Sequence, residues 1–151
     1  MKKSVICSLP MVVCLLGFAF NSAAAQSGQS KTAPPASKKA AEVRGIWSGT
    51  FYSKHSNVTP FSITVEINQN AEGHLIGTSS LSSDCLRGAK LQVSVDGSNV
   101  VLAGSDEDGD NITVRGTVDA SGVVLKSNYI LNGSATGRCE TDDGTGDLAK
   151  R

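Results

Sequence analysis

Hydrophobic and polar residues alternate along most of the chain beyond residue 44. The clearest case is residues 61–68, with the sequence Phe-Ser-Ile-Thr-Val-Glu-Ile-Asn. A two-residue period places the apolar side chains on one face of a β-strand and the polar side chains on the other. This segment is therefore predicted to be a strand with one buried face.

The same alternation recurs in several short segments, and turn-forming residues separate them. Residues 70–73 contain Asn and Gly, and residues 96–99 contain Asp, Gly and Asn. These residue types tolerate the backbone angles of tight turns. Residues 142–147, Asp-Asp-Gly-Thr-Gly-Asp, predict another acidic turn by the same reasoning. The predicted strands are residues 44–51, 61–68, 74–81, 90–96, 100–104, 111–119, 123–131 and 145–151.

About eight short strands joined mostly by tight turns predict an all-β fold. An eight-stranded antiparallel up-and-down barrel is favoured, because closure removes exposed strand edges. The alternative is a sandwich, whose crossovers would lie in the longer links at residues 52–60, 82–89 and 132–144. The interior of such a barrel is either filled by side chains or holds one small ligand.

The N-terminal part differs in composition from the rest, so the chain divides into three regions. Residues 1–25 carry a basic start, an apolar stretch and a small-residue cleavage site, as in a signal peptide. The apolar stretch, Val5 to Phe20, is too short for a membrane span, which needs about 20 residues. Residues 26–43 are rich in Ser, Ala, Lys and Pro and predict a disordered linker. Residues 44–151 are the predicted barrel domain.

Two cysteines, Cys85 and Cys139, remain after the predicted cleavage. An exported chain enters an oxidising compartment, where a single distant pair forms a structural disulfide. The expected location is periplasmic or secreted, in a bacterium. The 14 basic and 14 acidic side chains balance, and the absence of a basic stripe argues against a nucleic-acid partner.

The chain has one tryptophan, Trp47, in the segment Gly45-Ile46-Trp47 that opens the first predicted strand. With this Gly-x-Trp motif the chain resembles the calycin superfamily, which includes the avidins and lipocalins. The resemblance implies a basic residue packed across the indole, for which Lys150, Arg151 and Arg115 are the candidates. Avidins line their biotin cavity with several tryptophans, so biotin binding is not expected here. Trp47 is instead interpreted as a plug that closes one end of the barrel.

The sequence offers little chemistry for catalysis. Neither His55 nor His74 lies in a motif that places a nucleophile beside a base, and no cofactor is implied, so we do not expect an enzyme. Asp106, Asp108 and Asp110 have the spacing of calcium ligands, but the later positions of a calcium loop do not match. A solvated hairpin tip is the favoured interpretation.

The expected function is non-catalytic binding of a small molecule in a narrow barrel mouth, or of a protein through the rim loops. One alternative is an inhibitor of a periplasmic hydrolase, a protease or a lysozyme, which would use the loop at residues 52–60 as its anchor. Another is a structural component of the cell envelope. A small-molecule binder predicts a cavity beneath Trp47, and a filled interior would argue against one.

Overall fold

The computed structural model describes residues 39–82 and 84–151, which contain β-strands and loops but no helix long and apolar enough to cross a membrane. The predicted signal peptide and most of the predicted linker lie outside the described residues. The strands are β1 (Gly45–Ser53), β2 (Phe61–Gln69), β3 (Leu75–Leu81), β4 (Ala89–Asp96), β5 (Asn99–Ser105), β6 (Asn111–Val118), β7 (Val124–Asn132) and β8 (Asp142–Lys150).

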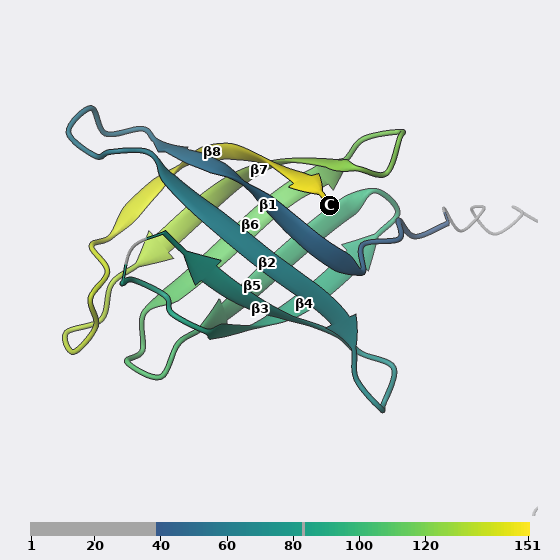
Figure 1. Ribbon diagram of the computed structural model, residues 1–151, viewed down its shortest axis with the longest axis horizontal. Helices are drawn as coiled ribbons and strands as arrows, with labels where there is room; N and C mark the ends of the chain where they lie inside the picture. The colour runs from purple at the N-terminus through teal and green to yellow at the C-terminus, as the bar shows by residue number, and fades with distance from the viewer. Residues whose placement is uncertain (1–38, 83) are drawn as a thin grey trace, which may run out of the picture. The chain divides into compact units, whose positions relative to one another are not determined.

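The eight strands form one closed antiparallel barrel in sequence order (Figure 1). Closure comes from the pairing of β1 with β8, in which Trp47 lies opposite Lys150 and Ser53 opposite Gly144. The predicted up-and-down barrel is confirmed. The sandwich alternative is wrong, because the three longer links join neighbouring strands and contain no crossover.

One predicted element is wrong. Residues 142–147 are not a turn but the first two-thirds of β8. The inward positions of this strand include Gly144 and Gly146, so the hydrophobic alternation that marks the other strands is missing. These glycines make room for aromatic rings, because a Cβ atom at Gly146 would overlap the ring of Phe51.

Inward-facing side chains fill the barrel interior and form one continuous cluster. Along β1, Gly49 and Phe51 follow Trp47 inward, and Leu148 lies opposite Gly49. The space beneath Trp47 is therefore occupied, which counts against the expected small-molecule binder with a cavity at that place. A ligand site among the described residues has to lie outside the filled interior. The fully buried members with the largest side chains are Trp47, Tyr129, Phe51, Ile63, Ile67, Leu86, Leu102, Ile112, Leu148, Val43, Val65 and Val100.

Residues before β1 cover one end of the barrel. The indole Nε1 of Trp47 donates a hydrogen bond of 2.7 Å to the carbonyl of Val43, whose side chain is buried in the core. The Lys150 ammonium lies 5.6 Å from the centroid of the indole ring. The barrel therefore includes the last residue of the predicted linker, and Lys150 is the basic residue over the tryptophan.

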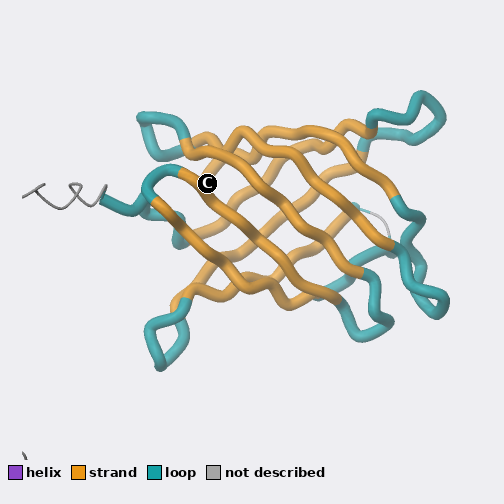
Figure 2. Tube along the Cα trace, turned by 180° about the vertical axis from the view of Figure 1, so that it is seen from behind, coloured by secondary structure: helices purple, strands orange, loops and turns teal. Residues whose placement is uncertain are grey.

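The loops fall into two groups, one at each end of the barrel (Figure 2). Hairpins β2–β3, β4–β5 and β6–β7 lie at the end that contains Trp47, where β1 starts and β8 finishes. The shortest has two residues, Gly97 and Ser98, between the paired Asp96 and Asn99. The opposite end carries the other four loops, residues 54–60, 84–88, 106–110 and 133–141. We call these four loops and the strand ends beneath them the mouth.

Candidate functional site at the barrel mouth

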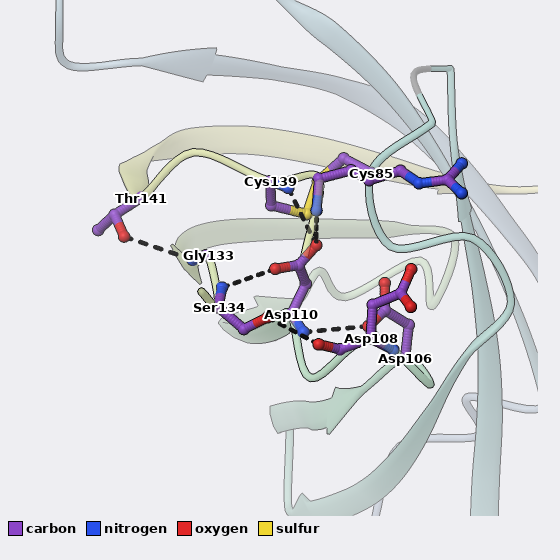
Figure 3. The surroundings of a disulfide bond; sticks show 9 residues. Cys85, Asp106, Asp108, Asp110, Gly133, Ser134, Cys139 and Thr141 are labelled. Atoms are coloured by element: carbon purple, nitrogen blue, oxygen red, sulfur yellow. Dashed lines mark hydrogen bonds between the residues drawn. A yellow bond between two sulfur atoms is a disulfide. The ribbon is translucent and has the colours of Figure 1, made fainter. Parts of the chain in front are cut away.

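A disulfide joins two loops of the mouth. Cys85 and Cys139 are bonded, with their Cα atoms 4.9 Å apart. The bond links the loop after β3 to the loop before β8 (Figure 3). This confirms the disulfide predicted from the sequence. Next to it, Leu86 is fully buried and has a positive φ of 51°, which is uncommon for a branched side chain.

A buried carboxylate ties a third loop to the same place. Asp110 is fully buried, and its oxygens accept hydrogen bonds from the backbone N–H groups of Ser134 (2.7 Å), Arg138 (2.7 Å) and Cys139 (2.9 Å) (Figure 3). These donors, Ser134 first, hold the pKa of Asp110 below its ordinary value although burial opposes them. Gly137 is required beside it, because a Cβ atom there would overlap the carboxylate.

The three evenly spaced aspartates do not gather around a common centre. Asp106 accepts hydrogen bonds from the backbone N–H groups of Asp108 (3.1 Å) and Asp110 (3.0 Å). Asp110 faces the neighbouring loop instead. Within residues 39–82 and 84–151, no three His, Cys, Asp or Glu side chains are placed to hold a metal ion. The solvated-tip interpretation fits the exposed Asp108 but is wrong for Asp110, which is a structural anchor.

The mouth contains a pocket of about 270 Å³ beside the disulfide. Its apolar walls come from Val58, Phe61, Leu81, Leu131 and the disulfide itself. Four charged side chains also line it, namely Asp84, Arg138, Glu140 and Asp142. Asp84 is paired with Arg87, whereas Arg138 has no ion pair within the described part of the chain.

Three aromatic rings pack together under the pocket. Phe51 and Tyr129 are stacked with centroids 4.7 Å apart, and Phe61 meets them edge-on at 5.8 Å and 5.4 Å. Such stacked and edge-to-face arrangements add to the stabilisation from burial. A Cβ atom at Gly144 would overlap the Tyr52 carbonyl oxygen and lie 2.7 Å from the Tyr129 ring, so glycine is needed there too.

Asp142 is the charged group that lies deepest in the pocket wall. Only 6 % of its surface is exposed, and its oxygens accept hydrogen bonds from the Ser53 and Tyr129 hydroxyls, each 2.5 Å long. Burial raises the pKa of Tyr129, and the hydrogen bond to Asp142 raises it further. Both bonding partners are neutral, and Asp142 has no ion pair to any residue that the structure describes.

The next residue, Asp143, points outward and fastens the loop at residues 54–60. Its carboxylate lies 2.7 Å from the Lys54 ammonium and 3.3 Å from His55 Nε2. The hydrogen bond from Lys54 lowers the pKa of Asp143. His74 follows the hairpin at the opposite end, so the two histidines do not meet.

The structure separates the residues that the sequence singled out. Cys85 and Cys139 lie in the mouth, Trp47 lies at the opposite end and His55 lies on the rim. Sequence reasoning missed Asp142 and Tyr129, because residues 142–147 were assigned to a turn. The sequence carries no signal for Asp142, because its place opposite Leu131 is known only from the register of β7 and β8.

Fold and site together define the class: an eight-stranded antiparallel barrel with a filled interior and a disulfide-tied pocket in its mouth. Comparisons with protein-family models, with curated proteins and with solved structures found no significant match to this chain. The calycin-like character of the Gly-x-Trp motif remains a resemblance in sequence.

Proposed function

We propose that this chain is a non-catalytic binding protein whose ligand enters the pocket in the barrel mouth. The observation that carries the proposal is the combination of apolar walls with a buried carboxylate in one open pocket. Binding sites for small molecules commonly pair a mostly apolar lining with a few placed polar groups.

The size of the pocket limits what it holds. Ligand pockets for drug-sized molecules span roughly 300 to 1,000 Å³, and this one is about 270 Å³. One small molecule, or one side chain of a partner protein, fits that volume. A ligand does not fit along the barrel axis, because side chains fill the interior.

The bonding of the polar groups supports binding rather than catalysis. Ser53 donates its hydroxyl hydrogen to Asp142 and accepts a hydrogen bond from the backbone N–H of His55. The His55 side chain turns instead to Asp143. A serine nucleophile of the serine–histidine type donates its proton to the imidazole, whereas Ser53 donates to a carboxylate and the His55 imidazole faces Asp143.

The disulfide supports export. Such bonds persist in oxidising compartments and are rare in the bacterial cytosol. We therefore propose a periplasmic or extracellular location, for which the signal-like features of residues 1–25 are a second argument.

A pair of variants tests the proposal. Thr59 is exposed and lines the pocket, whereas Thr78 is exposed on the outer face of β3. Ligand-observed NMR with a library of small amphipathic molecules is expected to find molecules that bind the wild-type protein. Thr59→Trp should abolish their binding, whereas Thr78→Trp should leave it unchanged. Binders that persist in Thr59→Trp would overturn the assignment of the site.

A second candidate function is inhibition of a hydrolase by the loop at residues 54–60. The supporting observation is its rigid base, where the backbone N–H of Lys54 donates to the Asp143 carbonyl (2.9 Å) and the two side chains form an ion pair. Assays of lysozyme and of serine proteases test it. Inhibition that Lys54→Ala weakens would favour this candidate over the pocket.

A further inference from the structure

We propose that the mouth pocket binds an amine: an ammonium group carried on a short apolar chain or ring, with Asp142 as its counter-charge. This inference rests on the proposed function, because it assumes that the pocket is the ligand site. It names the chemistry of the ligand, which the proposed function leaves open.

The first argument is the cost of the buried carboxylate. Removing an ionised carboxylate from water is unfavourable unless hydrogen bonds and an opposite charge compensate. Asp142 has two hydroxyl donors but no cation among the residues described. A neutral acceptor would satisfy the Tyr129 hydroxyl equally well, so the negative charge itself is unexplained by the fold.

The second argument is geometric. Each carboxylate oxygen accepts up to two hydrogen bonds, and each oxygen of Asp142 has one donor in the structure. One acceptor position on each oxygen is therefore unused, on a side chain that lines the pocket. An ammonium group has three donors and matches such a site.

The third argument comes from the walls and the remaining charges. Val58, Leu81 and Leu131 provide apolar surface for the stem that carries the amine. Of the charged side chains lining the pocket, Asp84, Glu140 and Asp142 are acidic and only Arg138 is basic. Arg138 is exposed at the rim and opposes a cation there, and Arg87 neutralises Asp84. The charges of Glu140, Asp142 and Arg138 still sum to a negative value, which favours a cation.

A matched set of probes separates the inference from the proposed function. Hexylamine, hexanol and hexanoate share one apolar chain and differ in the head group. Titration of the oxidised protein, followed through backbone amide NMR shifts, is expected to rank them amine first, alcohol second and carboxylate last. The shifts should fall on Leu131 and on residues 138–142.

Two isosteric variants assign the effect to one side chain. Asp142→Asn is expected to weaken hexylamine binding roughly tenfold, the loss typical of a charge-assisted hydrogen bond. Asp147→Asn is the control, because Asp147 is exposed on the outer face of β8 and does not line the pocket, and the affinity of this variant for the amine should equal that of the wild type. If Asp142→Asn fails to fold, the ranking of the three probes with the wild-type protein still tests the inference.

A second experiment distinguishes a small-molecule amine from a lysine side chain of a partner protein. It uses a tripeptide with a central lysine and chemically blocked termini. Tighter binding of the peptide than of hexylamine supports the inference with a protein side chain as the ligand. Tighter binding of hexylamine supports it with a small molecule.

Three results would overturn the inference. Equal binding of all three probes in the pocket would leave the proposed function intact but would exclude a preference for an amine. Equal losses in Asp142→Asn and Asp147→Asn would exclude Asp142 as the counter-charge. Shifts confined to the opposite end of the barrel would overturn the inference and the proposed function together.

Discussion

The two ends of the barrel are closed by different chemistry. At the Trp47 end, short hairpins surround a buried indole that donates its hydrogen bond to the Val43 carbonyl. At the mouth, four loops are held by a disulfide and by the buried carboxylates of Asp110 and Asp142. One end is closed mainly by apolar burial, and the other contains buried charge.

The two kinds of closure differ in their energetic cost. Burial of apolar side chains stabilises a fold. A buried charge, in contrast, destabilises it unless hydrogen bonds or an opposite charge compensate. The charge of Asp110 is compensated by three backbone donors. The charge of Asp142 is compensated only in part. This contrast supports the proposal that the mouth is the binding end and that the Trp47 end contributes stability.

The largest expected effect is at the Trp47 end. Trp47→Ala removes a side chain that is 1 % exposed together with its hydrogen bond. It is expected to lower the free energy of unfolding by about 5 kcal/mol, measured by urea denaturation. Tyr52→Ala is the control, because Tyr52 is 57 % exposed on the outer face of β1 and its loss should change stability little. A small effect of Trp47→Ala would contradict the stabilising role of this end.

Removal of the disulfide tests the mouth. The Cys85→Ser, Cys139→Ser double variant opens a link between residues 54 positions apart, which the chain-entropy model values at about 4 kcal/mol. Urea denaturation measures the loss, and amide NMR shifts are expected to change at the mouth while those around Trp47 do not. Wild-type protein under reducing conditions should behave like the variant. Unchanged stability would show that the bond does not constrain the loops.

The sequence predicted the fold better than the site, and particular residues show why. The alternation in residues 61–68 reflects local geometry, so β2 could be read directly. Cys85 and Cys139 were paired because only two cysteines remained. Asp142 and Tyr129 meet across two strands, so their contact depends on the register of a strand whose glycines hide its pattern. The three backbone donors to Asp110 likewise belong to a loop 24 or more residues away, which sequence spacing does not reveal.

Addition of one methyl group at Gly144 tests the packing around the aromatic rings under the pocket. Gly144→Ala places a Cβ atom against the Tyr129 ring and the Tyr52 carbonyl. Overpacking of this kind costs about 2 kcal/mol, and we expect the melting temperature to fall and pocket amide shifts to change. Thr145→Ala is the control on the exposed face of β8. An equal response of both variants would show that Gly144 is not confined by the ring.

The smallest expected effect is a change in acid sensitivity. The pKa of Asp110 is lowered in the folded protein, so its contribution to stability is present above the unfolded pKa, about 3.9, and is lost as pH falls through the folded pKa. Asp110→Asn should be less stable at neutral pH and lose less stability than the wild type on acidification below about pH 4.

Thermal unfolding across this pH range measures the difference. Asp108→Asn serves as the control, since Asp108 is exposed at the hairpin tip. Parallel pH profiles for wild type and Asp110→Asn would contradict the anchoring role of the carboxylate.

The assignment of binding to the mouth is tested most directly by locating a bound ligand. The Trp47 end offers a competing surface, a groove of about 740 Å³ lined in part by Ala41, Leu75, Val93 and Val95. Backbone amide NMR shifts with hexylamine, or with any tighter binder from the library, distinguish the two ends. We predict shifts at Leu131 and residues 138–142 with the Trp47 end unchanged. Shifts centred on the groove at the Trp47 end would contradict the account.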